Sequence, residues 1–83
     1  MVFSVTVHVE LRPGISDPQG ATIERSLPAL GFNGVTNVRV GKMLTFTVDA
    51  VDAAAAETEV RDMCDRFLAN PVIEDSTISV EAA

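Results

Sequence analysis

Apolar and polar residues alternate along the first twelve positions of the chain. One side of this segment carries Phe3, Val5, Val7, Val9 and Leu11, and the other carries Ser4, Thr6, His8, Glu10 and Arg12. A period of two is typical of a β-strand with one buried face. The pattern therefore predicts a strand over Val2–Arg12, which Pro13-Gly14 would end in a turn.

A helical spacing of apolar residues follows. Ser16 or Asp17 would cap this helix, and Pro18 suits its first position, where a missing N–H costs nothing. The shared apolar face consists of Ile23, Leu27 and Leu30. Gly31 is a typical C-terminal stop, and we expect Pro28 to bend or fray the last turn because it lacks a backbone donor.

A second helical segment begins after Asp52, which is a good capping residue, and stops at Asn70-Pro71. Its expected core face consists of Ala56, Val60, Met63, Cys64 and Phe67, with Leu68 flanking them. Charged residues occupy the other face, as is typical of a solvated surface. We therefore expect Phe67 to be buried, so that its truncation to alanine would cost roughly 3–5 kcal/mol.

Three further segments have strand patterns. Val35–Val40 and Met43–Asp49 are separated by Gly41-Lys42, which suits a two-residue hairpin, and Ser76–Glu81 forms the last strand. The order of elements is then strand, helix, strand, strand, helix, strand. This order predicts an α+β, ferredoxin-like fold, in which both helices cover one face of an antiparallel sheet.

The uncovered face of this sheet would be rich in hydroxyl groups. It would carry Ser4, Thr6, Thr45, Thr47, Thr77 and Ser79. A nearly uncharged face is covered at low desolvation cost, because the centres of protein interfaces are depleted in charge. Threonine is also simply a good strand former. We interpret the face as an oligomer contact, and its expected contact residues are Ser4, Thr6, Thr45 and Thr47.

Composition favours self-association and limits the partners. The chain has 83 residues, of which 47% are hydrophobic and 5% aromatic, so we expect a single domain spanning 1–83 with an aliphatic core. So many apolar residues in so short a chain indicate surplus apolar surface, and hence a dimer or tetramer. The net charge of −6 disfavours binding to nucleic acid or to an anionic membrane.

Other features favour a cytoplasmic location. The one cysteine, Cys64, cannot form an intrachain disulfide. No segment approaches the roughly 18 consecutive apolar residues of a membrane span. The first strand begins without the basic region and cleavage site of a signal peptide. We therefore expect a protein of the reducing cytoplasm.

Candidate chemistry is sparse. His8 is the only histidine, and its spacing suggests no partner for a metal site or a nucleophilic dyad. Cys64 lies on the expected core face, beside acidic residues that would oppose a thiolate. Gly41-Lys42 lacks the other glycine, the following serine or threonine, and the helix of a phosphate loop. We expect no catalytic, metal or cofactor site in the chain alone.

Four stretches resemble a known family. They are Asp17-Pro18-Gln19-Gly20, Leu30-Gly31-Phe32-Asn33, Val38-Arg39-Val40-Gly41-Lys42 and Leu68-Ala69-Asn70-Pro71-Val72-Ile73-Glu74. In order and spacing they resemble the PurS-type small subunit of formylglycinamidine ribonucleotide (FGAM) synthase, a multi-subunit enzyme of purine biosynthesis. The resemblance spans nearly the whole chain. It implies a subunit that assembles an active site without supplying one.

The resemblance also implies the partners. In that family a glutaminase subunit releases ammonia from glutamine, and a synthetase subunit uses ATP and Mg²⁺ to activate the amide oxygen of formylglycinamide ribonucleotide. The small subunit would bridge these two subunits and assist ammonia transfer. Free ammonia is mostly protonated near neutral pH, so its use as a nucleophile favours a sealed, water-poor route. The expected partner-interface residues are Asp17, Gln19, Arg39, Gly41 and Lys42.

One alternative of a different class stays open. A small-molecule-binding regulatory domain of the ACT type has the same order of strands and helices, and Arg12-Pro13-Gly14-Ile15 resembles its ligand loop. The match is short, and Pro-Gly after a strand is also an ordinary turn. RNA binding through the open sheet face is disfavoured, because that face lacks aromatic residues and the chain is acidic.

Overall fold

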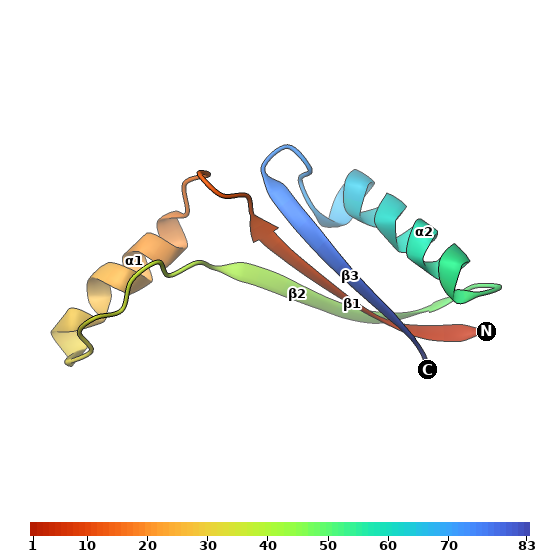
Figure 1. Cartoon of the computed structure of the whole chain (residues 1–83), viewed down its shortest axis with the longest axis horizontal. Coiled ribbons are helices and arrows are strands. Elements are labelled where there is room, and N and C mark those ends of the chain that lie inside the picture. Colours follow the sequence, from red (N-terminus) through yellow and green to blue (C-terminus); the bar gives the residue numbers. More distant parts are fainter.

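A three-stranded antiparallel sheet forms the centre of the molecule. The computed structural model describes all of residues 1–83, with strands β1 (Val2–Leu11), β2 (Gly41–Asp49) and β3 (Glu74–Ala82). Helix α1 (Pro18–Ser26) continues into a 3₁₀ turn η1 (Pro28–Leu30), and helix α2 (Ala53–Met63) into a π-helical turn η2 (Cys64–Leu68). β1 lies between β2 and β3, and both pairings are antiparallel (Figure 1).

The core lies between this sheet and α2. The alternation predicted along β1 is confirmed, since its apolar residues from Phe3 to Val9 are almost fully buried. The other buried hydrophobic residues are Ala56, Val60 and Cys64. Beside them pack half-buried residues of the outer strands, namely Leu44, Phe46, Val48, Ile78 and Val80. The core is aliphatic, as the composition predicts, and it is small.

Helix α2 begins as the sequence predicts. The Asp52 carboxylate accepts a hydrogen bond from the backbone N–H of Ala55 at 2.7 Å, which caps the helix. The helix lies on the β3 side of the sheet, where Arg61 donates to the backbone oxygen of Ser76 at 3.3 Å. Cys64 is buried, as expected for a small hydrophobic residue of the core face.

Phe67 is not a core residue, and that prediction is wrong. Its side chain is 88% exposed. The α-helix ends at Met63 and widens into η2, where the backbone N–H of Ala69 donates to the Cys64 oxygen at 3.1 Å. A π-helical turn changes the angle per residue. Leu68 and Ala69 therefore pack against the core where an unbroken α-helix would have placed Phe67.

Helix α1 has the predicted ends. Asp17 caps it and Pro18 occupies its first position. Pro28 ends the regular helix, and the chain continues as the 3₁₀ turn η1. Gly31 follows with a φ of 93°, a left-handed conformation that glycine adopts without steric cost. The capping signals and the break at Pro28 are confirmed.

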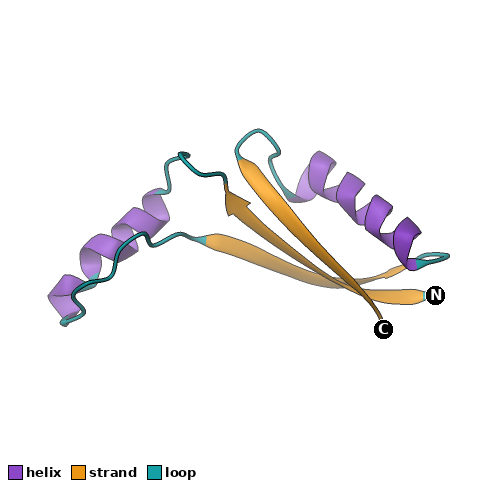
Figure 2. Cartoon of the chain, in the orientation of Figure 1, coloured by secondary structure: helices purple, strands orange, loops and turns teal.

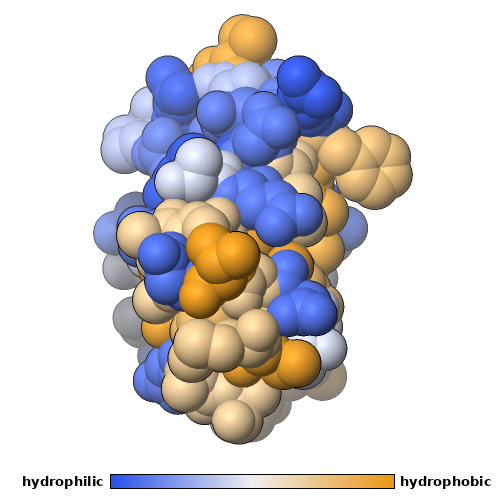
Figure 3. All heavy atoms as spheres, turned by 90° about the vertical axis from the view of Figure 1, so that its right-hand side faces the viewer, coloured by the Kyte–Doolittle hydropathy of each residue, from blue (hydrophilic) through white to orange (hydrophobic).

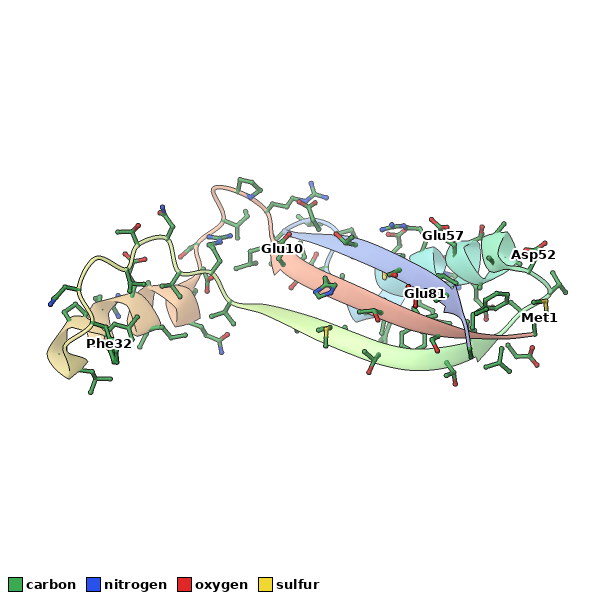
Figure 4. The ribbon with its side chains drawn as sticks, turned by 60° about the horizontal axis from the view of Figure 1, so that its bottom comes forward. Met1, Glu10, Phe32, Asp52, Glu57 and Glu81 are labelled. Carbon is green, nitrogen blue, oxygen red and sulfur yellow. The ribbon has the colours of Figure 1, made fainter.

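The position of α1 differs from the prediction. We call residues 18–40 the arm, because they lead away from the sheet and do not cover it (Figure 1). Ile23 is 43% exposed and Leu30 71% exposed, and Phe32 lies far out on the arm (Figure 4). The apolar face of α1 therefore has no sheet beneath it. Only α2 covers the sheet of a single chain.

Residues 35–40 do not form the expected strand, and Gly41-Lys42 is not a hairpin turn. Figure 2 draws the connection from the end of η1 to β2 as loop. Gly41 and Lys42 already belong to β2 and pair with Glu10 and Val9 of β1. Asn37 has a φ of 60°, which interrupts extended backbone. After it, the backbone N–H groups of Val38 and Val40 donate to the side chains of Glu24 and Asp17, so neither is available to a neighbouring strand.

The α+β class and the antiparallel sheet are confirmed, with three strands formed in place of four. The arm makes the molecule long and thin, with extents of 52 × 26 × 15 Å and a radius of gyration of 16.5 Å. A compact chain of this length would have a radius of gyration of roughly 12 Å. None of the helices combines the length and apolar character needed to span a membrane.

Apolar side chains also gather at the end of the molecule opposite the arm. Figure 3 shows this end, and its lower part is mostly apolar. The N-terminus and the turn between β2 and α2 lie here, and they expose Met1, Val2 and Val51. Apolar surface is thus present at both ends of the chain.

Candidate partner interface

Asp17 lies where the arm leaves the sheet. One carboxylate oxygen accepts a hydrogen bond from the backbone N–H of Gly20 at 2.9 Å, which caps α1. The other accepts from the backbone N–H of Val40 at 2.8 Å. A single side chain therefore joins the first turn of α1 to the residue that precedes β2. An alanine here would leave both backbone donors without their acceptor.

These contacts also set the charge of Asp17. The hydrogen bond from Gly20, and then that from Val40, lower the pKa of this carboxyl group, since both stabilise its anionic form. The nearby Arg39 lowers the pKa further, and partial desolvation opposes the shift. Asp17 is therefore anionic at neutral pH, with both oxygens occupied by backbone donors.

Two further contacts hold the arm together. The Glu24 carboxylate accepts a hydrogen bond from the backbone N–H of Val38 at 3.0 Å. Gly20 is buried beneath the same segment, and a Cβ on it would lie only 2.3 Å from the backbone oxygen of Val38. The chain can cross α1 at this distance only because residue 20 has no side chain.

Arg39 braces the base of the arm on its other side. Its guanidinium donates to the backbone oxygens of Leu11 and Ile15 at 3.2 Å each, and to that of Arg12 at 3.3 Å. Asp17 and Arg39 therefore both have internal partners that fix the direction of the arm.

Four of the five expected partner-interface residues meet at one hollow. Asp17, Gln19, Gly41 and Lys42 all line an open depression of about 330 Å³ at the junction of the arm with β1 and β2. Arg39 is not among its lining residues. A Cβ on Gly41 would lie 2.8 Å from the Val9 oxygen, so this glycine is required by close backbone approach. Gln19 and Lys42 are exposed, and no hydrogen bond within the chain occupies their side-chain polar groups.

The expected oligomer face is continuous in the structure. Ser4 pairs with Thr47 and Thr6 with Thr45 across β1 and β2, so all four side chains share the sheet face opposite α2. Thr77 and Ser79 of β3 extend this face beside His8 and Thr6. Thr6 is half-buried by its neighbours and the other five hydroxyl residues are exposed. We call this surface the hydroxyl face.

The loop that resembles an ACT ligand loop is occupied by structural contacts. The backbone N–H of Ile15 donates to the Arg12 oxygen at 3.2 Å, and Gly14 has a φ of 86°, as in a tight turn. Arg12 forms an ion pair with Asp75 at 3.2 Å and a hydrogen bond to the Pro71 oxygen. These contacts tie the loop to the start of β3. They explain this loop as an ordinary turn, without a bound ligand.

Comparison with known proteins decides the family. Residues 4–82 match the family model described as PurS, phosphoribosylformylglycinamidine (FGAM) synthase. The chain belongs to the PurS family. It is 44% identical to the PurS subunit of Methanothermobacter thermautotrophicus, over 96% of this chain and 94% of that one. The family resemblance seen in the sequence is thereby confirmed.

Solved PurS structures share the fold. The crystal structure of Methanocaldococcus jannaschii PurS has a TM-score of 0.86 and 40% identity, and 98% of each chain is covered. A chain of the structure of PurLQS from Thermotoga maritima has a TM-score of 0.87 and 31% identity, covering 96% of this chain and 98% of that one. The agreement over nearly the full length includes the arm, so the arm is part of the PurS fold.

The geometry explains why the PurS-like stretches have these residues. Glu24 and Gly20 hold the arm together with Asp17 and Arg39. Sequence reasoning assigned Glu24 no role, because a glutamate on a helix is usually a solvated surface residue. The spacing of Glu24 from Asp17 and Gly20 could have indicated this role. Asp17, Gly20 and Glu24 fall on one face of α1, and that face receives the segment ending at Val40.

Proposed function

We propose that this chain is the small assembly subunit of an FGAM synthase of purine biosynthesis. In this role it joins a glutaminase subunit to an ATP-dependent synthetase subunit and assists the transfer of ammonia between them. The observation that carries the proposal is the PurS family match over residues 4–82. Its likeness to a chain of PurLQS from Thermotoga maritima supports a role within an assembly.

The division of labour follows from the chemistry. The glutaminase subunit releases ammonia, and the synthetase subunit uses ATP with Mg²⁺ to activate the amide oxygen of formylglycinamide ribonucleotide. Ammonia then displaces phosphate to give the amidine. The small subunit binds no cofactor of its own in this proposal and acts in the cytoplasm. Its contribution is to align two sites and to keep water from the ammonia that passes between them.

The hollow at the base of the arm is the proposed contact with the other subunits. Gln19 and Lys42 are free to bond a partner there, while Asp17 and Gly41 shape the backbone beneath them. Lys42 is the only basic residue among several acidic lining residues, including Glu10 and Glu74. A partner carboxylate facing Lys42 would fix the register of the contact. Arg39 supports this surface from behind, through the three backbone oxygens that it binds.

Self-association is part of the same proposal. The six hydroxyl residues at the centre of this face carry no charge, so covering them costs little desolvation. Carboxylates border them, with Glu81 beside Ser4 and Asp75 beside Glu10. Ser4, Thr45 and Thr47 are the residues of this face that we expect at the contact, together with the half-buried Thr6. The domain as a whole, residues 1–83, would then act as one building block of the complex.

Reconstitution of the complex tests the proposal. The chain is mixed with glutaminase and synthetase subunits of an FGAM synthase, with ATP, Mg²⁺ and glutamine present, and complexes are separated by size-exclusion chromatography with light scattering. We expect a complex containing all three subunits, and a Lys42→Ala variant that enters it less completely. A Glu59→Ala variant, altered at an exposed charged residue of α2, serves as the surface control. Co-elution of the two large subunits without any bound chain would refute the assembly role.

A further inference from the structure

A hollow lined by charged residues lies where α2 ends and β3 begins (Figure 1). Its volume is about 320 Å³, at the lower end of the range for small-molecule pockets. It shares only Glu74 with the hollow at the base of the arm. The charged side chains that line it are Arg12, Arg61, Asp65, Glu74 and Asp75. Of the loop that resembles an ACT ligand loop, only Arg12 takes part.

Three of these charged groups have partners within the chain. Arg12 forms the ion pair with Asp75 at 3.2 Å and also donates to the Pro71 oxygen. The Glu74 carboxylate accepts a hydrogen bond from the backbone N–H of Asn70 at 2.7 Å. These contacts hold the turn before β3 in place. They fix the wall of the hollow that this turn and β3 provide.

Arg61 and Asp65 are the charged groups of the lining that have no ionic partner. Arg61 donates through Nη1 to the Ser76 backbone oxygen at 3.3 Å and to the Ser76 hydroxyl at 3.2 Å, so its Nε and Nη2 groups stay free. Asp65 forms no hydrogen bond or ion pair, although it follows Arg61 by four residues. The neighbouring Asp62 and Arg66, at the same spacing, do pair at 3.2 Å. A free cation and a free anion therefore line one hollow without neutralising each other.

The balance of charge selects the kind of ligand. The lining has two guanidinium groups against three carboxylates, so a phosphate or another multivalent anion would be repelled. A divalent metal ion would need several free oxygen ligands, and Asp65 alone is free among these carboxylates. A small zwitterion satisfies both free groups at once. Its carboxylate would accept a bidentate pair of hydrogen bonds from Nε and Nη2 of Arg61, and its ammonium group would donate to Asp65.

We propose that this hollow binds a free α-amino acid, with the carboxylate of the ligand on Arg61 and its ammonium group on Asp65. Ser76 already fixes the Arg61 guanidinium, so less conformational freedom is lost on binding. The site goes beyond the assembly role and does not depend on it. Glutamine is the amino acid that the proposed complex consumes, and glutamate is the one that it releases. The choice of these two as probes rests on the proposed function, whereas the ligand class rests on the hollow.

Titration of the isolated, isotopically labelled chain, followed by NMR, tests this site. The probes are glutamine, glutamate and glycine. Glycinamide, which lacks the carboxylate, and N-acetylglycine, which lacks the ammonium group, are the ligand controls. We expect saturable shifts of the Arg61 Nε–H signal and of the backbone amides of η2 with at least one of the amino acids. Both controls should bind roughly tenfold more weakly or not at all, because each lacks one charged contact.

Paired variants of one helix complete the test. Asp65→Asn is nearly isosteric and removes no internal contact, so it should fold as the parent does and bind the amino acid roughly tenfold more weakly. Arg61→Gln should weaken binding in the same way. The matched controls Asp62→Asn and Arg66→Gln change the same residue types outside the hollow and should leave the affinity unchanged.

The outcomes separate this site from the assembly role. The absence of any saturable shift with the three amino acids refutes the site. N-acetylglycine binding as tightly as glycine would reveal a simple anion site, which also refutes the proposal, as does an Asp65→Asn variant with the affinity of the parent. Because the isolated chain is titrated, none of these results bears on the assembly role, which reconstitution tests separately.

Discussion

Replacing Gly20 by alanine probes the packing that fixes the arm. The added Cβ would lie 2.3 Å from the backbone oxygen of Val38 and 2.7 Å from the Asp17 carboxylate. Both distances are well inside van der Waals contact, so the segment that crosses α1 must move outward. That movement stretches the hydrogen bond from Val38 to Glu24, which measures 3.0 Å in the parent.

The expected change in the free energy of unfolding combines opposing effects. Alanine is the better helix former, by about 0.8–1.0 kcal/mol, and this stabilises the variant. Overpacking costs about 1–3 kcal/mol, since the atom that must yield is backbone. Weakening the bond from Val38 to Glu24 adds about 1 kcal/mol. The net expectation is a loss of roughly 1–3 kcal/mol, with a fall in Tm of roughly 4–8 °C per kcal/mol.

Urea unfolding followed by far-UV circular dichroism measures this loss. All variants are compared at one protein concentration, because self-association makes apparent stability depend on concentration. Gln19→Ala, at the exposed neighbouring position, is the matched control and should change stability by less than about 0.5 kcal/mol. If Gly20→Ala were instead more stable than the parent, as alanine in an unobstructed helix would be, the close crossing over α1 would be wrong.

Substitutions at Phe67, Arg39 and Asp17 test other parts of the structure. Phe67→Ala should lower the free energy of unfolding in urea by less than about 1 kcal/mol, because the ring is 88% exposed. Val60→Ala should lower it by more, because Val60 is fully buried. A larger loss for Phe67→Ala would show that Phe67 belongs to the core. Arg39→Ala should lower Tm, and Arg39→Lys should restore it only in part, because Arg39 binds three backbone oxygens. Lys42→Ala should leave Tm unchanged and weaken complex formation. Equal Tm values for these three variants would show that Arg39 does not brace the arm. Because the pKa of Asp17 is lower in the folded chain than in the unfolded one, its carboxylate stabilises the fold fully above about pH 4. This stabilisation is lost as the pH falls through the folded-state pKa. The stability difference between the parent and Asp17→Asn should therefore shrink on acidification, and a constant difference would contradict it.

Local signals in the sequence predicted the elements well. The alternation along β1 identified its buried face, and Asp17 and Asp52 were correctly assigned as helix caps. Pro28 and Gly31 ended the first helix as expected. These features depend on residues a few positions apart, so periodicity and capping chemistry suffice to find them.

The position of the arm was beyond such signals. A helix with an apolar face is expected to pack on another apolar surface. Its periodicity does not say whether that surface belongs to the sheet of the same chain. The segment ending at Val40 has the composition of a strand, yet its backbone donors bind Asp17 and Glu24. Phe67 was misplaced because the change to a π-helical turn after Met63 alters the face on which later residues lie. Each miss comes from a tertiary or backbone contact that the spacing of apolar residues does not encode.

The site was predicted in part. Asp17, Gln19, Gly41 and Lys42 meet at one hollow, and their use as a partner surface remains a prediction. Arg39 was also expected to contact a partner, since it belongs to a stretch that carries the family resemblance. The structure gives it three backbone oxygens of its own chain instead. Residues that carry a family resemblance thus include both those that shape the arm and those left free on its surface.

The ratio of glutamine-dependent to ammonia-dependent synthesis of FGAM tests the central claim most directly. It is measured with the glutaminase and synthetase subunits, ATP and Mg²⁺, in the presence and absence of this chain. If the chain couples the two subunits, its omission should abolish synthesis from glutamine and largely spare synthesis from added ammonia, because free ammonia bypasses the glutaminase. A full glutamine-dependent rate from the two large subunits alone would contradict the account.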